Sequence, residues 1–169
     1  MTRMFKPALG ALVAGLIASA CASTTTAPAP TGPVAFDREA FAWSVKPGRG
    51  SIDGRLTYSA KGVTYSCTDV VMTPETPWVR QRMETLYQSA KGARTPATVV
   101  RSRTPSGSQD YSAFVKMARC DASGRFNFSG LADGAWFVIT VGRPTPAGAD
   151  MAIMRRVVIR NGGAVKLDL

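Results

Sequence analysis

The most informative segment of this sequence runs from Cys120 to Val141 and reads Cys-Asp-Ala-Ser-Gly-Arg-Phe-Asn-Phe-Ser-Gly-Leu-Ala-Asp-Gly-Ala-Trp-Phe-Val-Ile-Thr-Val. Near its start, Asp121, Ser123 and Gly124 carry turn chemistry. An aspartate side chain can accept a hydrogen bond from the backbone two residues on, and glycine adopts the positive φ that closes a tight reversal. We therefore expect a turn here, with a strand on each side.

The rest of this stretch has the pattern of two strands. Phe126 and Phe128 are two residues apart, so in a strand they project to one face. Glycine punctuation at 130–134 is followed by a β-branched and aromatic run at 136–141. Both alternating sets in that run are largely apolar, so both faces should be covered. The pattern predicts a hairpin of a β-sandwich, with its outer face covered either by a helix of the chain or by a partner protein.

The order of turn, Gly-Arg-Phe-x-Phe, Gly-Leu, small-Asp-Gly and aromatic strand resembles the carboxypeptidase regulatory-like domain. Residues 50–54 look like that family's first strand, and Val70-x-Met72-x-Pro74 looks like its second. The resemblance implies an antiparallel transthyretin-like (prealbumin-like) β-sandwich. It also implies a module that assists folding or recognition rather than chemistry. The residues that carry the main match are Asp121, Gly124, Phe126, Phe128, Leu131, Gly134 and Trp136.

Other strands are indicated by alternation along the chain. Residues 52–58 alternate between apolar and polar side chains, which predicts a strand with one wet face. The segment 63–73 should form the next strand, with a bulge near Thr68 and Asp69 because its apolar residues change phase there. The expected fold class is mostly β, a sandwich of about seven strands. Further strands are expected at 97–103, 111–120, 151–160 and 164–169, with turns at 144–149 and 161–163.

One amphipathic helix is expected within a long insert at about 75–109. Thr76 is a suitable N-cap and Pro77 suits the first helical position. From Val79 to Ala90 the apolar residues recur at helical spacing, so one face of this helix should be buried. We expect Gly92 to end the helix.

Residues 1–20 have the features of a secretory signal peptide: a positive start, a short apolar run and small residues before Cys21. The apolar run is too short to span a bilayer comfortably. The sequence Ala18-Ser19-Ala20-Cys21 is similar to a bacterial lipobox, which implies that Cys21 is lipidated. Ordinary cleavage beside an incidental cysteine is the alternative. Ala22 rather than Asp after the cysteine implies the periplasmic face of the outer membrane.

Residues 21–33 should form a tether, because a segment rich in Thr and Pro cannot bury apolar surface. A single domain is expected at 34–169. Its lead-in carries Phe36, Phe41 and Trp43, which would pack against the domain or form a surface patch for a partner.

Apart from Cys21, the chain has two cysteines, Cys67 and Cys120, an even number for an exported protein. A disulfide between them would close a loop of about 54 residues and contribute roughly 4 kcal/mol in the chain-entropy model. Two buried free thiols are the alternative interpretation. The chain has no Cys-x-x-Cys motif, so redox catalysis is not indicated.

The chain contains no histidine. This removes the usual nucleophile pairs, the commonest general base and the usual zinc, copper and non-haem iron ligand sets. Hydroxyisourate hydrolases, which share the transthyretin fold, depend on histidine. Asp121 and Asp133 occupy turn positions, and no carboxylate spacing indicates a glycosidase pair or a calcium loop. We expect a non-enzymatic protein with no cofactor and no metal.

The chain is basic, with 21 Lys and Arg against 11 Asp and Glu. From Cys21 onward the balance is 19 minus 11, or +8, which favours anionic partners. Arginines interleaved with aromatic residues in the insert could hold phosphate or carboxylate groups. A solvated basic helix face is the simpler alternative. The candidate binding residues are Trp78, Arg80, Arg82, Tyr87, Arg94, Arg101 and Arg103.

These features lead to two functional hypotheses. The first is a binding or scaffold subunit of a protein assembly in the cell envelope, anchored to the membrane by its N-terminal lipid. The second is a binder of an anionic envelope polymer or lipopolysaccharide through the basic insert. An enzyme with an unusual carboxylate or serine site has low weight. Nucleic acid is not an expected partner, since an exported protein rarely meets it.

Overall fold

The computed structural model describes residues 32–106 and 109–169. The proposed signal peptide, Cys21 and nearly all of the tether therefore lie outside the described residues. The described residues belong to one compact unit. No helix in that part of the chain is long and apolar enough to cross a lipid bilayer.

Strands dominate the described residues, and they lie in two sheets. The strands are β1 (Gly50–Arg55), β2 (Ser59–Ala60), β3 (Val63–Ser66), β4 (Asp69–Pro74), β5 (Gly92–Pro96), β6 (Lys116–Arg119), β7 (Arg125–Leu131), β8 (Gly134–Thr145), β9 (Met151–Ile159) and β10 (Ala164–Asp168). The helices are α1 (Pro77–Tyr87), α2 (Ala97–Ser102) and the 3-10 helices η1 (Glu39–Val45) and η2 (Ser112–Phe114).

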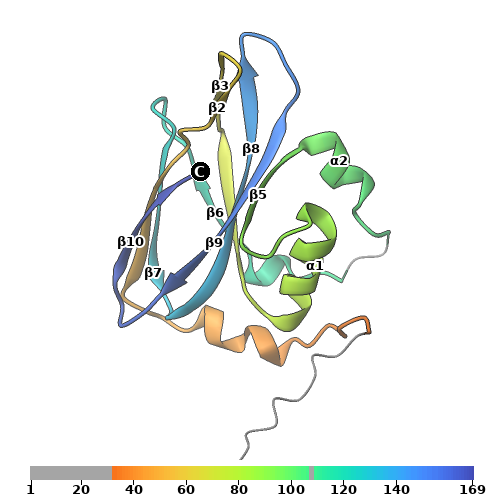
Figure 1. Ribbon diagram of the computed structural model, residues 1–169. Helices are drawn as coiled ribbons and strands as arrows, with labels where there is room; N and C mark the ends of the chain where they lie inside the picture. Colours follow the sequence, from red (N-terminus) through yellow and green to blue (C-terminus); the bar gives the residue numbers. More distant parts are fainter. Residues whose placement is uncertain (1–31, 107–108) are drawn as a thin grey trace, which may run out of the picture. The chain divides into compact units, whose positions relative to one another are not determined.

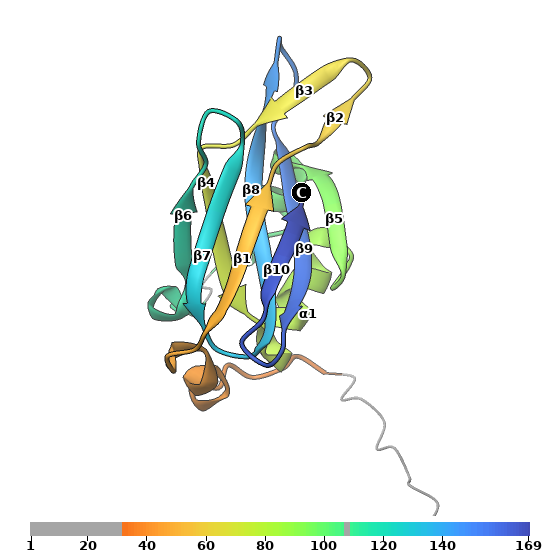
Figure 2. The same cartoon turned by 90° about the vertical axis from the view of Figure 1, so that its left-hand side faces the viewer.

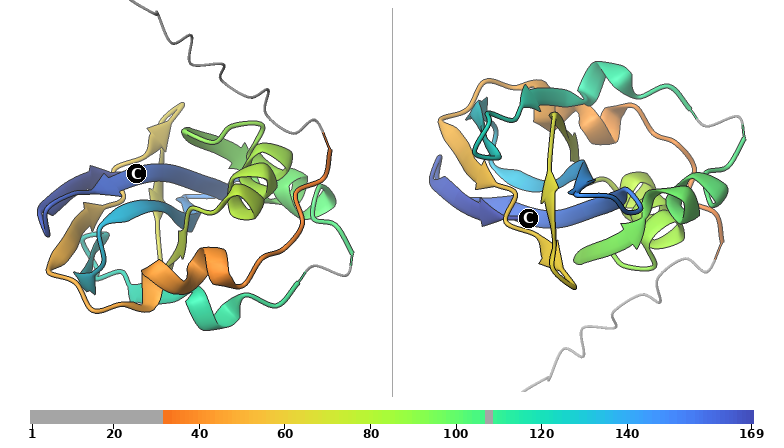
Figure 3. Two further views of the ribbon diagram at one scale, coloured as in Figure 1. Left: turned by 90° about the horizontal axis from the view of Figure 1, so that it is seen from below. Right: turned by 90° about the horizontal axis from the view of Figure 1, so that it is seen from above.

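The smaller sheet has the order β10-β1-β7, and the other seven strands form the larger sheet. In the larger sheet β8 pairs with both β4 and β9, β6 extends the β4 side, and β5 extends the β9 side. The two sheets face each other, and α1 and α2 lie on the opposite side of the larger sheet (Figures 1 and 2). Seen end-on, the layers are small sheet, large sheet and helices (Figure 3). The predicted β-sandwich is confirmed, although the described residues form ten strands rather than about seven and one pair, β1 with β10, is parallel.

The first core fills the space between the sheets. Alternate residues of each strand point into it, because successive side chains of a strand face opposite sides. Trp136 and Val138 of β8 meet Phe126 and Phe128 of β7 there, as their spacing predicted, and all four are at most 5% exposed. Trp43 of the lead-in packs edge-on against Trp136, with ring centroids 5.0 Å apart.

The second core lies between the outer face of the larger sheet and the helices. Phe137 of β8 and Met154 of β9 are almost fully buried against Val79 and Met83 of α1. The lead-in residue Phe41 closes the same core and stacks on Phe114 at 4.7 Å. The helices therefore cover the outer face of β8 around Phe137, whereas Val141 on the same face is 42% exposed. The lead-in packs on the domain, as the first alternative predicted.

The predicted hairpin is wrong in its pairing. β7 pairs with β1 in the smaller sheet, whereas β8 pairs with strands of the larger sheet. The segment between them is thus a crossing from one sheet to the other. The turn predicted at Asp121 has the expected geometry, with Gly124 at φ 75°, but it too joins strands of different sheets, β6 and β7. Local turn chemistry was correctly recognised, while the partner of each strand was not.

Several local boundaries also differ from the prediction. Residues 97–103 form helix α2 rather than a short strand, since their apolar side chains pack toward the second core. The predicted strand at 111–120 is a 3-10 turn followed by β6. The segment 63–73 is two strands, interrupted where a bulge was expected. Helix α1 ends at Tyr87 because Gln88 adopts a left-handed conformation, four residues before the expected stop.

The disulfide between Cys67 and Cys120 is confirmed, with Cα atoms 5.8 Å apart. Both cysteines lie just beyond the end of the β4–β6 pairing, where Asp69 is opposite Arg119. The Cys120 N–H also donates to the Thr68 carbonyl at 2.9 Å. The covalent bond therefore fastens edge strand β6 to the sheet.

Candidate anion-binding site

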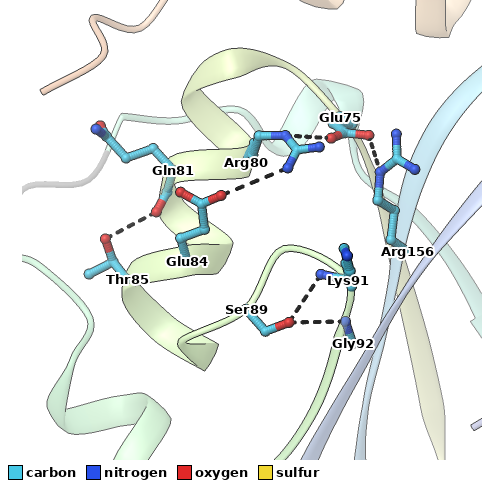
Figure 4. Close-up of polar contacts among 9 residues, drawn as sticks. All are labelled: Glu75, Arg80, Gln81, Glu84, Thr85, Ser89, Lys91, Gly92 and Arg156. Carbon is cyan, nitrogen blue, oxygen red and sulfur yellow. Dashed lines mark hydrogen bonds and ion pairs between the residues drawn. The ribbon is translucent and has the colours of Figure 1, made fainter. Parts of the chain in front are cut away.

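The seven candidate binding side chains lie in different surroundings. Arg80 is engaged by two carboxylates of its own chain, with Nε 2.9 Å from Glu75 and Nη1 3.8 Å from Glu84 (Figure 4). Glu75 also pairs with Arg156 of β9 at 2.5 Å, and its side chain is only 10% exposed. This network fastens the start of α1 to the larger sheet, so Arg80 has a structural partner already.

Three other arginines of the candidate set are also separated from one another. Arg103 donates from Nη1 to the Leu86 carbonyl at 3.1 Å and so satisfies one free carbonyl at the end of α1. Arg94 lies on β5, with its guanidinium 4.9 Å from the ring centroid of Tyr58. Arg101 is exposed in the last turn of α2.

Trp78 and Arg82 are the candidates that the fold brings into one site, whereas Tyr87 is buried in the second core. Trp78 and Arg82 are four residues apart on α1 and therefore share one side of the helix. The Arg82 guanidinium lies 5.7 Å from the Trp78 ring centroid and 5.9 Å from that of Tyr111. The two rings are themselves 5.2 Å apart and edge-on. Sequence reasoning missed Tyr111, because this residue enters the cluster from the segment before η2, far from α1 along the chain.

A pocket of about 230 Å³ opens beside this cluster, lined by Trp78, Gln81, Arg82, Thr85, Pro105, Ser106 and Gln109. We call it the Arg82 pocket. One wall is held by Gln81, whose amide oxygen accepts from the Val34 N–H at 2.8 Å. The Gln81 amide nitrogen donates to the Gly32 carbonyl at 3.2 Å, so the start of the domain is fastened to the same wall.

Charge and burial make Arg82 the distinctive group of this pocket. Its Nε is buried without a hydrogen-bond partner, and among the described residues Arg82 has no ion pair. A buried donor that lacks an acceptor is costly, so an anion that shares the guanidinium would be favoured. Burial raises the pKa of the neighbouring Tyr87 to about 12, helped by Tyr111 and opposed by Arg82. Tyr87 therefore stays neutral and does not neutralise the arginine.

A larger depression of about 690 Å³ lies over the outer face of the smaller sheet. Asn127 donates to Asp53 at 2.6 Å in this depression, and Arg55 donates to the Ser123 carbonyl at 3.1 Å. Cations and carboxylates lie side by side in its lining. Because charges of both signs line it, we regard this face as a solvated sheet surface.

Catalytic or metal-binding clusters are not evident in the part of the chain that the structure describes. No group of three or more Cys, Asp or Glu side chains there could hold a metal ion. Asp121 and Asp133, the turn carboxylates, accept backbone N–H groups of their own and neighbouring loops. The Arg82 pocket is lined by a guanidinium and an aromatic ring that lie in contact with each other.

Comparison with known proteins gives similarity in fold. No protein-family model matches the sequence, and no curated protein is significantly similar to it. A candidate carbohydrate-binding protein from Pseudomonas aeruginosa matches 82% of this chain and 100% of its own, with a TM-score of 0.56 and 16% identity. The full-length major pilin SpaD from Corynebacterium diphtheriae matches 73% of this chain and 31% of its own, with a TM-score of 0.30 and 13% identity. The first likeness supports the β-sandwich fold.

Proposed function

We propose that this protein is a non-enzymatic binding module of the bacterial envelope that holds an acidic glycan in the Arg82 pocket. Lipid on Cys21 would anchor it to the periplasmic face of the outer membrane. The observation that carries this proposal is the Arg82 guanidinium, which lies against two aromatic rings without a carboxylate partner among the described residues.

The chemistry of the pocket suits a sugar that bears a carboxylate or phosphate. A guanidinium presents two parallel donors that match either group, and aromatic rings pack against the apolar faces of sugars. Ser106 and Gln109 add a hydroxyl and an amide to the rim. The structural neighbour from Pseudomonas aeruginosa, named as a candidate carbohydrate-binding protein, is compatible with this ligand class.

A binding role also agrees with the lack of histidine in the chain and with the resemblance of its sequence to the carboxypeptidase regulatory-like domain. Without histidine, the commonest general base is absent. We further propose that the domain is a distant relative of the carboxypeptidase regulatory-like domain. In support, Phe126, Phe128, Leu131 and Trp136, four residues of the match, are all buried in the core between the sheets.

Titration of the purified mature protein with acidic and neutral oligosaccharides tests this proposal. We expect Arg82→Gln to weaken binding of an acidic glycan by about tenfold or more, as loss of a charge-assisted hydrogen bond does. Arg82→Lys should retain part of the affinity. Arg101→Gln is the matched control, because it removes the same charge from an exposed site on the neighbouring helix.

An equal loss of affinity in Arg82→Gln and Arg101→Gln would mean that binding depends on overall charge. That result would contradict binding of the glycan in the Arg82 pocket. Failure of every acidic glycan to bind the unmodified protein would refute the glycan hypothesis. Near-ultraviolet circular dichroism of each variant establishes that the aromatic cluster is still packed.

A second candidate function, a scaffold subunit of an envelope protein assembly, is favoured by one specific observation. The part of the larger sheet that the helices leave uncovered carries Met117, 67% exposed, and Val141, 42% exposed. Val71 lies opposite Met117 on β6 and Ile139 on β8, so all four point to one face. We call these four residues the apolar strip. Exposed apolar groups that lie together often mark protein contacts.

Site-specific photo-crosslinking in native membranes tests the scaffold hypothesis. A photoreactive amino acid at position 117 should capture one protein in amounts comparable to the bait, and the product should persist in high salt. The same probe at Lys166, on the outer face of the smaller sheet, is the control. Equal labelling from both positions, or none at position 117, would contradict docking on the apolar strip.

A further inference from the structure

Two arginines on neighbouring strands face one depression, on the side of the larger sheet that carries no helices. In the β5–β9 pair, Gly92 lies opposite Arg155 and Arg94 lies opposite Ile153. Residues opposite each other share a face, so Arg94 and Arg155 project to the same side, diagonally across the pair. Ile153 belongs to the core between the sheets, which identifies this side as the one that looks toward the smaller sheet.

The depression has a volume of about 280 Å³ and is lined by Gly92, Ala93, Arg94, Ile153, Met154 and Arg155. Gly92 leaves room for the Arg155 side chain along the backbone of β5. A Cβ at that position would lie 3.3 Å from Cδ of Arg155 and 3.5 Å from its Nη1. On the other side, Arg94 lies over the Tyr58 ring at 4.9 Å, and Tyr58 packs on Tyr65 at 4.8 Å. Both guanidiniums are therefore supported by the fold.

The charges around this depression are of one sign. Arg156, the next residue after Arg155, points to the helix side and pairs with Glu75. By contrast, neither Arg94 nor Arg155 forms an ion pair within the described residues, and no carboxylate lines the depression. Two cations held close together repel each other, and a doubly charged anion between them removes that repulsion.

We propose that Arg94 and Arg155 form a binding site for a phosphoryl group. Arginine forks pair with two oxygens of a phosphate at once, and two forks can engage a phosphate dianion from both sides. The phosphoryl group can belong to a lipid headgroup or to free phosphate in the periplasm, since the recognition chemistry is shared. This site is separate from the Arg82 pocket, which belongs to the helix layer on the other side of the larger sheet, and it does not depend on the proposed glycan.

The test follows the Nε–Hε signals of arginine by NMR in the mature protein, held in phosphatidylcholine nanodiscs. One arm adds inorganic phosphate, and the other replaces part of the lipid by phosphatidic acid. We expect signals of Arg94 and Arg155 to shift in at least one arm. A response to inorganic phosphate identifies a soluble ligand class, and a response to phosphatidic acid alone identifies a lipid headgroup.

Variants of the protein distinguish binding at this site from a general effect of positive charge. Arg94→Gln and Arg155→Gln should each weaken binding of the responding probe by about tenfold or more. Gly92→Ala keeps every charge and places a methyl group in contact with Arg155, so it should change the affinity less than either arginine variant does. Arg101→Gln and Arg143→Gln are charge-matched controls outside the depression and should change the affinity by less than about twofold.

Absence of a shift at both arginines in both arms would overturn the proposal, as would equal losses in the controls. Arg82→Gln should leave phosphoryl binding intact. The two proposals can therefore fail separately. If no acidic glycan binds, only the proposal for the Arg82 pocket is refuted. If no phosphoryl group binds, only the proposal for Arg94 and Arg155 is refuted.

Discussion

At the residue scale, single carboxylates direct the chain from one sheet to the other. Asp121 accepts from the N–H groups of Ser123 and Arg125 at 2.8 and 2.9 Å, and the Arg125 N–H is the main reason why the pKa of Asp121 is lowered. Asp133 accepts from the N–H groups of Asn161 and Gly162, at 2.6 and 2.8 Å. It thereby joins the loop between β7 and β8 to the loop between β9 and β10, and both of these loops cross between the sheets.

Tyr87 provides a prediction about pH at this scale. Its pKa is about 12 in the folded chain and about 10 when exposed, because burial disfavours the charged phenolate. Between these values only the unfolded chain loses the proton, so the free energy of unfolding should fall as the pH rises from 10 to 12. The contribution is about 2–3 kcal/mol and is fully present below pH 10.

Urea unfolding of the wild type and of Tyr87→Phe across this range is the measurement. The variant should lack this part of the alkaline decline, so its free energy of unfolding relative to that of the wild type should rise between pH 8 and pH 11. If the free energy of unfolding of Tyr87→Phe falls with pH as much as that of the wild type, ionisation of the buried phenol is not the cause of the fall.

At the element scale, helix α1 is the cover of the second core, and its start is secured by a side chain. Thr76 is 3% exposed and its hydroxyl accepts from the Val79 N–H at 3.1 Å, as the sequence predicted for an N-cap. Val79 and Met83 of the same helix cover Phe137 of β8. The position of the helix over the sheet thus depends on both the cap and the apolar face.

We expect Thr76→Ala to lower the free energy of unfolding by about 1 kcal/mol, because the Val79 N–H loses its acceptor. Thr76→Ser should restore most of the stability, since it keeps the hydroxyl. Chemical unfolding followed by Trp fluorescence measures both variants. Equal loss in the Ser and Ala variants would show that the methyl group, and not the cap, matters at this position.

The disulfide acts on another element, the edge strand β6. We expect Cys67→Ala/Cys120→Ala to lower the free energy of unfolding by about 2–4 kcal/mol. Because the bond fastens the end of β6, amide hydrogen exchange should accelerate more at Lys116–Arg119 than in β9, which is paired on both sides. A uniform acceleration over both strands would contradict this local role.

At the scale of the whole molecule, the proposed lipid anchor and the excess positive charge would act together. From Cys21 onward the chain carries 19 basic and 11 acidic side chains. All 11 acidic residues lie between Asp37 and Asp168, so the local pairing in the described residues decides which cations are free. Glu75 engages Arg80 and Arg156, whereas Arg82, Arg94 and Arg155 remain without ion pairs there. A tethered domain of this kind would present its free cations to anionic envelope components.

Lipid anchoring predicts that Cys21→Ser moves the protein from the membrane fraction to the soluble periplasmic fraction. Cys67→Ser/Cys120→Ser is the control and should remain with the membrane, because those cysteines form the disulfide. Cell fractionation with mass measurement of the N-terminal peptide gives the result. An unmodified N-terminal peptide in the wild type would refute lipidation.

Local signals in the sequence predicted most of the strands, the start of α1, the disulfide and the burial of Trp136 and Phe137 on opposite faces of β8. These signals are alternation with period two, a capping residue, cysteine number and an apolar run. Which strands pair and which arginines meet depends on tertiary contacts. The hairpin prediction failed because two strands joined by a short loop can lie in different sheets when each has an apolar face to bury between them. The arginines of the insert separated because Arg80 pairs locally with Glu75, whereas the capping of α1 by Arg103 and the packing of Arg94 on Tyr58 depend on contacts between residues far apart in the chain.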